Sequence, residues 1–286
     1  NMEAGLLRAM GDSQRPVISL IVACLVNIVM DLVLVVGLKM GVAGAALATV
    51  ISQVVSAVML LVVLLREKEN PLELSRLGIQ PKLLRRILAI GVPAGLQGSL
   101  FSISNVLIQS SVNWTAYTKT DALTWMVSGA FGVAITTFVG QNYGAHRYDR
   151  VRQSVRVCLA MSIGTVGVIS LLMTVFRRVI LGVYTTDTSV IETGAYIISV
   201  IVPFAATFMP VEIFAGTMRG MGDSMRPTAI ICLSVCVVRV LWIMTAVKKY
   251  HTLLMLCVCY PMTWVLCAIV FIVTYLRAFR PRLEEV

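Results

Sequence analysis

Residues 54–65 read VVSAVMLLVVLL, a run without any charged side chain that is apolar at odd and even positions alike. A strand of a membrane-spanning barrel would alternate apolar and polar residues, so this run favours a helix over a barrel. Extended back to Val42, the apolar stretch exceeds the roughly 20 residues that a helix needs to cross a bilayer. The pattern therefore predicts a transmembrane helix over Val42–Leu65.

Seven further stretches of the same kind follow one another along the chain, each bounded by the Gly, Pro or charged residues that favour helix ends. Of the 286 residues, 58% are hydrophobic and 13% are charged, whereas a soluble domain carries about 25% charged residues. A soluble core cannot bury so much apolar surface, but a bilayer accommodates it. We predict an all-α polytopic membrane protein with about eight transmembrane helices, at Val17–Val36, Val42–Leu65, Ile87–Val112, Ala122–Val139, Val155–Phe176, Val190–Ala215, Thr228–Val247 and Leu253–Tyr275.

The net charge of +10 follows the predicted membrane topology. When alternate loops are assigned to opposite sides, seventeen Lys and Arg residues fall on one side, six fall on the other, and Arg239 lies within a span. By the positive-inside rule the richer side, which also holds the C-terminus, is cytoplasmic. Anionic lipid accounts for such a basic surface, so we expect membrane lipid and no nucleic acid among the partners.

A twelve-residue segment occurs twice in the chain, at Gly5–Pro16 and at Gly216–Pro227. The first reads GLLRAMGDSQRP and the second GTMRGMGDSMRP, so eight of the twelve positions are identical at a constant offset of 211 residues. In both copies the segment lies between one predicted span and the next, on the basic side. This repetition predicts a duplicated membrane unit whose two halves run parallel.

The position of the two copies also predicts the domain organisation. Two predicted spans follow each copy, but four spans precede the second copy and only Asn1–Ala4 precede the first. We therefore expect four further spans before Asn1, in a protein of twelve spans and two six-helix lobes. Residues 1–65 would be the C-terminal part of the first lobe with two spans, residues 66–86 a cytoplasmic linker, and residues 87–286 a complete second lobe.

The repeated segments are accompanied by other recognisable motifs. These motifs are Gly140–Arg147 (GQNYGAHR), Asn27-Ile28 with Asp31, Gly41–Thr49 (GVAGAALAT) with Ile51-Ser-Gln53, and Gly91–Ala94 (GVPA). In their order and spacing the sequence resembles the multidrug and toxic compound extrusion (MATE) transporter family. The connection over residues 114–120 is shorter than is usual in that family.

The resemblance implies a monomeric transporter of the inner or plasma membrane that expels small organic cations against an inward flow of Na⁺ or H⁺. In the family, two six-helix lobes enclose a central cavity that opens alternately to the cytoplasm and to the outside. Apart from the coupling ion, no cofactor is expected. Neither the substrate nor the choice between Na⁺ and H⁺ follows from the resemblance.

Acidic residues within the predicted spans are the first candidates for binding a coupling ion, because a carboxylate at that depth is costly unless it is paired, hydrated or protonated. Glu212 is the leading candidate for Na⁺ or proton binding, and the alternative is that it neutralises Arg219. Asp121 opens the fourth span, where it could line a cavity or stabilise the first helical turn. Asp31 follows Asn27 by four residues on one helix face, and we favour a structural role for this pair over a cavity role.

Other polar residues within the spans extend this candidate site. Arg239 is the basic residue inside a predicted span, and we expect an acidic partner, with Glu212 the first suspect because the two spans are adjacent in sequence. A stripe of uncharged polar residues fits either a hydrated cavity or interhelical hydrogen bonds. Its members are Gln53, Gln97, Asn105, Gln109 and Asn113.

The sequence argues against an enzyme. Its two histidines, His146 and His251, fall in predicted loops on opposite sides of the membrane, and it contains no H-E-x-x-H, G-x-S-x-G or phosphate-loop motif. None of the seven cysteines forms a C-x-x-C pair, so the sequence predicts no catalytic residue and no metal centre besides a Na⁺ at Glu212. The alternatives to drug export are a lipid-precursor flippase of a related superfamily and a membrane scaffold that transports nothing.

Overall fold

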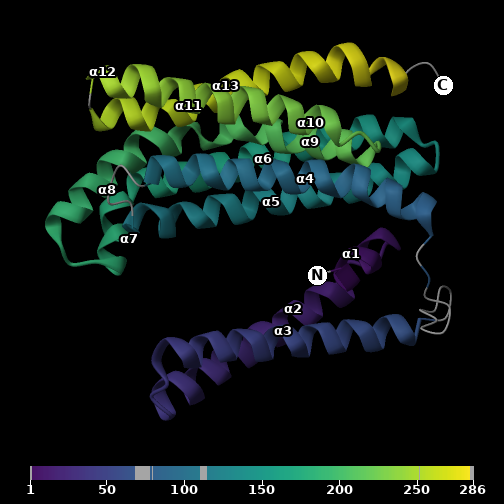
Figure 1. The fold of residues 1–286 in the computed structure, drawn as a ribbon, viewed down its shortest axis with the longest axis horizontal. Helices are drawn as coiled ribbons and strands as arrows, with labels where there is room; N and C mark the ends of the chain where they lie inside the picture. Colours follow the sequence, from purple (N-terminus) through teal and green to yellow (C-terminus); the bar gives the residue numbers. More distant parts are fainter. Residues whose placement is uncertain (1, 68–77, 79, 110–114, 251, 284–286) are drawn as a thin grey trace. The chain divides into compact units, whose positions relative to one another are not determined.

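The computed structural model describes residues 2–67, 78, 80–109, 115–250 and 252–283. Within these ranges all regular secondary structure is helical, as Figure 1 shows. The chain packs as two compact units, Asn1–Gln80 and Pro81–Val286. The all-α prediction is confirmed, whereas the assignment of residues 1–65 and 87–286 to two lobes stays a prediction.

The first unit is a pair of long helices that a short helix precedes in the sequence. Ser19 of one long helix and Ser56 of the other bring their hydroxyl groups to 2.9 Å. The short helix packs Leu7 against Leu60 and Leu64. The helices are α1 (Met2–Ala9), α2 (Gln14–Asp31), which continues into the π-helix η1 (Leu32–Gly37), and α3 (Gly41–Leu65).

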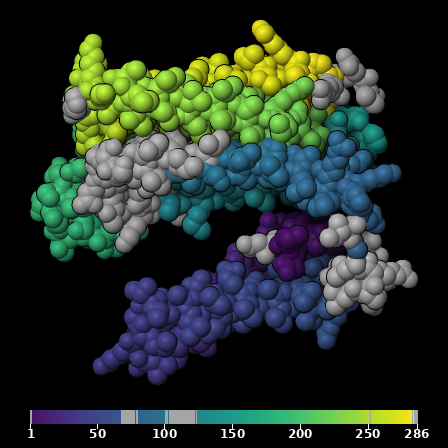
Figure 2. Space-filling model, viewed as in Figure 1, coloured from purple at the N-terminus to yellow at the C-terminus, as the bar shows by residue number. Residues whose placement is uncertain are grey.

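The second unit is a bundle of long helices that lie side by side (Figure 1). Along its upper edge in Figure 2, the yellow-green and yellow surface belongs to the segments after Met225. In order, its helices are α4 (Pro81–Gln109), α5 (Thr115–Gly144), α6 (Tyr148–Val175), α7 (Arg177–Tyr184), α8 (Thr188–Ile201), η3 (Val202–Phe208), α9 (Met209–Gly220), α10 (Met225–Ile231), η4 (Cys232–Val237), α11 (Val238–Trp242), η5 (Ile243–Val247), α12 (Lys248–Tyr250), α13 (Leu253–Thr274), η6 (Tyr275–Phe279) and η7 (Pro281–Leu283).

Six continuous helical segments are long and apolar enough to cross a membrane in the described part of the chain. The other two predicted spans, Ile87–Val112 and Ala122–Val139, fall on α4 and α5, which contain 29 and 30 residues. The six segments are Gln14–Gly37, Gly41–Leu65, Tyr148–Val175, Thr188–Gly220, Met225–Tyr250 and Leu253–Phe279.

The segment Thr188–Gly220 changes helix type at its middle and contributes many residues to the core of the second unit. A 3₁₀ helix, η3, interrupts it, with Pro203 in the first turn, and Pro210 lies in the first turn of α9, which begins at Met209. Proline cannot donate a backbone hydrogen bond, which explains why the regular helix breaks here. Beyond the break, α9 is buried on nearly all sides, from Met209 to Met218. This burial makes α9 the central helix of the unit.

The two copies of the repeated segment have the same backbone structure. In each copy a helix ends, a glycine with positive φ makes the turn, and the next helix begins three residues later. The φ angle is +92° at Gly11 and +88° at Gly222. The hydrogen bond from the Asp12 N–H to the Leu7 carbonyl measures 2.9 Å, as does that from Asp223 to Met218.

The acidic and basic side chains of the repeat also have the same contacts in both copies. Asp12 accepts from the backbone N–H of Arg15 at 3.1 Å, and Asp223 accepts from that of Arg226 at 3.2 Å. The Nε of the arginine also lies close to the carboxylate of this aspartate, at 3.1 Å in the first copy and 3.3 Å in the second. The aspartate therefore fixes the first turn of the following helix, as the motif predicts for a structural corner.

We expect Gly222→Ala to destabilise the protein by about 1–2 kcal/mol, because an L-residue with a side chain disfavours the left-handed backbone region. Thermal unfolding of the detergent-purified protein would show a lower Tm. Gly164→Ala is the matched control, because Gly164 lies in α6 with open space around its Cα. An unchanged Tm for Gly222→Ala would contradict the role assigned to the turn.

Candidate functional site

Glu212 lies in the first turn of α9, in the interior of the second unit. Its carboxylate is 3.9 Å from the guanidinium of Arg219, two turns along the same helix, and about a quarter of each side chain is exposed (25% and 22%). Of the two partners considered from the sequence, the structure therefore has Glu212 beside Arg219. The pair combines a carboxylate at membrane depth with a nearby cation, while a part of each group stays accessible.

The carboxylate of Glu212 also rests against the backbone of α5. A Cβ atom on Gly132 would lie 2.6 Å from the Glu212 Oε2, so any other residue at position 132 would displace the carboxylate. Glu212, Gly216 and Gly220 follow one another at intervals of four residues and so share one face of α9. That face packs on α5, where Gly140 lies beside Gly220.

The two helices show a small-residue pattern that the sequence prediction missed. Positions 132, 136 and 140 of α5 are Gly, Thr and Gly, and positions 216 and 220 of α9 are both Gly. Small residues spaced by four allow close approach of helix backbones in membranes, where no hydrophobic effect drives helices together. This spacing was a readable signal for the contact that places Glu212.

Arg239 is fully buried in α11, and its environment differs from the one expected. Its Nε donates to the Thr263 hydroxyl at 3.3 Å, and its guanidinium carbon lies 4.3 Å from the centre of the Tyr260 ring. Both partners are on α13. The expected pairing with Glu212 is not what the structure has, because the carboxylate of Glu212 is paired with Arg219. A hydroxyl and an aromatic face stabilise the cation here.

Tyr260 belongs to an aromatic cluster that the sequence analysis did not single out. Trp264 follows it by one turn, with ring centres 6.0 Å apart, and Trp125 of α5 and Phe208 of η3 pack on Trp264 at 6.2 Å and 5.9 Å. Trp125 and Phe208 contact each other edge to face at 5.0 Å. The spacing of Tyr260 and Trp264 within an apolar helix was the available signal.

Asp31 and Asn27 lie in the first unit, one turn apart at the end of α2. The Asp31 Oδ1 and the Asn27 Nδ2 are both buried, and neither atom has a hydrogen-bond partner within the described part of the chain. A structural fastening of two helices would supply such partners. Unpaired buried polar atoms are costly, so this pair is a stronger candidate for binding a ligand than the sequence indicated.

The remaining candidates are placed less completely. Asp121 lies in α5 but not in its first turn, because the helix begins at Thr115, and the predicted role in stabilising a helix start is wrong. The Gln97 Oε1 is buried without a hydrogen-bond partner in the described region. Asn105 and Gln109 lie on α4, and their side chains, like that of Asp121, are outside the described residues, as is Asn113.

Gln53 is the last of the polar candidates. It lies on α3, is exposed, and lines a hollow in the first unit together with Thr49 and Glu3. Within the residues described, no three or more His, Cys, Asp or Glu side chains come together as a metal site would require. An ion bound at Glu212 or Asp31 would therefore have no more than two such ligands from the described residues and would need neutral oxygen ligands as well.

Comparison with known proteins identifies the kind of protein that carries these residues. The family model MatE matches residues 114–245, which include α5, α9 and Arg239. This matched region is somewhat less than half of the chain and is similar to a family of transporters. Together with the six long apolar helices, the match indicates a multi-pass membrane protein.

Several curated relatives of the chain carry names that describe drug resistance. The "Probable multidrug resistance protein YoeA" of Bacillus subtilis is 28% identical over 241 residues, which are 78% of this chain and 52% of that protein. The "Multidrug resistance protein PmpM" of Pseudomonas aeruginosa is 30% identical over 166 residues, or 51% of this chain and 32% of that protein. The chain spans about half the length of YoeA.

Solved structures confirm the MATE fold. A crystal structure of a MATE protein in complex with MaL6 matches 99% of this chain and 66% of its own, with a TM-score of 0.86 and 19% identity. A MOP superfamily transporter from Pyrococcus furiosus matches 99% of this chain and 65% of its own, with a TM-score of 0.87 and 19% identity. At this identity the likeness establishes the fold.

The buried Arg239 gives a test of the observed contacts. Thr263→Val keeps the side-chain shape but removes the hydroxyl that accepts from Arg239, so we expect a loss of about 1–3 kcal/mol in unfolding free energy. Thermal unfolding in detergent would register it as a lower Tm. Thr274→Val is the matched control on α13, since the hydroxyl of Thr274 bonds the Val270 carbonyl of its own helix. Equal Tm values for the two variants would contradict a stabilising role for the Thr263 contact.

Proposed function

We propose that the protein exports small organic cations in exchange for Na⁺ or H⁺, as a secondary-active transporter. The observation that carries this proposal is the presence of two carboxylates, Asp31 and Glu212, in membrane-spanning segments of a MATE-type fold. The names of the relatives, which describe multidrug resistance in those proteins, support export of varied organic compounds. We place the protein in the inner or plasma membrane, as a monomer with its C-terminus in the cytoplasm.

A carboxylate at membrane depth provides the physical basis for exchange. It carries one unit of negative charge, so binding one cation or one proton neutralises it and removes the attraction for a second cation. An organic cation and the coupling ion would therefore bind in alternation. Alternating access would carry each of them across in opposite directions, with residues 1–65 in one lobe, 87–286 in the other and 66–86 linking them.

The two carboxylates differ in a way that suggests different roles. Glu212 has Arg219 at 3.9 Å, a partner that could hold the carboxylate between two binding events. Asp31 has a buried oxygen without a hydrogen-bond partner in the described residues, and such an oxygen gains most from a bound cation or proton. We therefore propose Asp31 as a coupling-ion site alongside Glu212, with Asn27 as its neutral neighbour.

We expect Asp31→Asn and Glu212→Gln each to abolish efflux of a fluorescent organic cation, because both changes remove the negative charge and keep the side-chain size. Efflux would be followed in cells that express equal amounts of each variant. Glu192→Gln is the matched control, since Glu192 is exposed and paired with Arg178 near the start of α8. Normal efflux by either variant would remove that carboxylate from the mechanism.

The coupling ion can be identified with the same protein in vesicles. Transport driven by a Na⁺ gradient at uniform pH would indicate Na⁺ exchange, and transport driven by a pH gradient without Na⁺ would indicate H⁺ exchange. Transport that persists without either gradient would contradict antiport altogether.

The contact between Glu212 and Gly132 provides a test that leaves both charges in place. We expect Gly132→Ala to lower the efflux rate severalfold, because the new Cβ would overlap the Glu212 carboxylate and push it from its position. Gly129→Ala, on the same helix with open space around it, should transport at the normal rate. Equal rates for the two variants would show that the exact position of the Glu212 carboxylate does not limit transport.

A further inference from the structure

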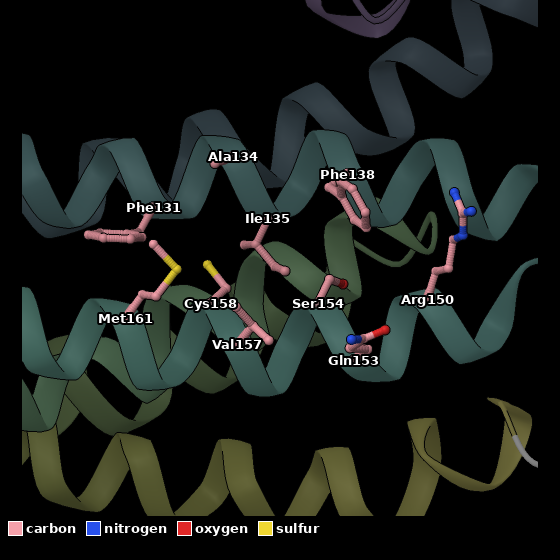
Figure 3. A pocket seen from close by; sticks show the side chains of 10 residues that line it. All are labelled: Phe131, Ala134, Ile135, Phe138, Arg150, Gln153, Ser154, Val157, Cys158 and Met161. Atoms are coloured by element: carbon pink, nitrogen blue, oxygen red, sulfur yellow. The ribbon is translucent and has the colours of Figure 1, made fainter.

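A groove runs between α5 and α6 in the second unit. Its volume is about 640 Å³, within the range of small-molecule sites. Figure 3 shows side chains from both helices converging on it. Neither Glu212, Asp31 nor Arg239 lines this groove.

One end of the groove is polar and positively charged. Arg150 and Gln153 lie there, and neither side chain has an ion-pair or hydrogen-bond partner within the part of the chain described. The nearby acid, Asp149, is paired with Arg152 and so does not neutralise Arg150. The end of the groove therefore offers an uncompensated guanidinium and a free amide, which together suit a phosphate group.

The rest of the groove is apolar. Phe131, Ile135 and Phe138 of α5 face Val157 and Met161 of α6, and Phe131 and Met161 lie at the end away from Arg150 (Figure 3). Hydrocarbon would fill such a surface, with methionine adapting to its shape. The groove thus matches a molecule with an anionic head and an apolar tail, and its charge disfavours an organic cation.

The surroundings of the groove favour a lipid as that molecule. Arg147 and Arg156 lie close along the chain, both exposed and without a carboxylate partner in the described residues, so positive charge extends beyond Arg150. This is the side of the protein on which the basic residues concentrate. Basic pockets between transmembrane helices on such a side bind the head groups of anionic lipids.

We propose that the groove between α5 and α6 binds an anionic phospholipid, with its phosphate at Arg150 and Gln153 and one acyl chain along the apolar side chains. This lipid site is separate from the carboxylates of the proposed transport mechanism. The bound molecule would be a lipid of the surrounding membrane, and it would hold α5 and α6 together near the Arg-rich start of α6.

The test compares two lipids with identical acyl chains, dioleoyl-phosphatidylglycerol and dioleoyl-phosphatidylcholine, by native mass spectrometry of the detergent-purified protein. We expect tighter binding of phosphatidylglycerol. Arg150→Gln should lower this preference by about fivefold, the effect of removing one basic contact to an anionic lipid. Arg178→Gln, which removes an exposed charge far along the chain, is the matched control and should leave the preference unchanged.

A second pair of variants tests the apolar part. Ala134→Trp would fill the groove and should weaken phosphatidylglycerol binding, whereas Val133→Trp, at an exposed neighbouring position outside the lining, should not. Melting curves would establish that all four variants are folded.

Three results would overturn the proposal. The first is equal binding of the two lipids by the unaltered protein. The second is an equal loss of preference in Arg178→Gln and Arg150→Gln, which would mean that net charge alone is sensed. The third is phosphatidylglycerol binding that Ala134→Trp leaves intact.

Discussion

The contact between α5 and α9 determines how the second unit is built, and glycine residues determine how closely the two helices approach. A Cβ on Gly216 would lie 2.6 Å from the Ile135 Cγ2, and one on Gly220 would lie 2.8 Å from the Thr136 carbonyl oxygen. Only glycine allows this approach, and in a membrane the gain comes from dispersion contacts between close backbones. The central position of α9 follows, and with it the place of Glu212.

The amino-acid sequence predicts the helical class and the approximate spans because bilayer thickness demands long apolar runs, such as Gly41–Leu65, that can be read directly. It predicts the breaks within them less well. Pro203 explains the 3₁₀ segment Val202–Phe208, but η5, a π-helix, contains no proline or glycine from which it could be predicted. The start of α5 at Thr115 was also missed, because Lys119 and Asp121 looked like the polar edge of a span.

The candidate site was only partly predictable for a different reason. Charged residues within apolar runs are conspicuous, so Asp31, Glu212 and Arg239 could be found, but their partners depend on which helices meet. Adjacent spans suggested that Arg239 would contact Glu212, whereas the bundle brings it to Tyr260 on α13. Contacts across a bundle depend on helix rotation and tilt, which local periodicity does not encode.

The π-helical segments have a consequence for how each long helix meets its surroundings. Segment η1 begins at Leu32 and η5 at Ile243, the same 211-residue offset that separates the repeated corners. A π-turn holds one extra residue, which advances the helical phase by on the order of 100° relative to an uninterrupted α-helix. A row of side chains that faces one neighbour near the repeated segment therefore faces in another direction beyond the π-helical segment. In Gln14–Gly37 this shift affects the residues at the end of the segment, whereas Met225–Tyr250 contains a second π-helical segment, η4, and its helical phase is therefore shifted twice.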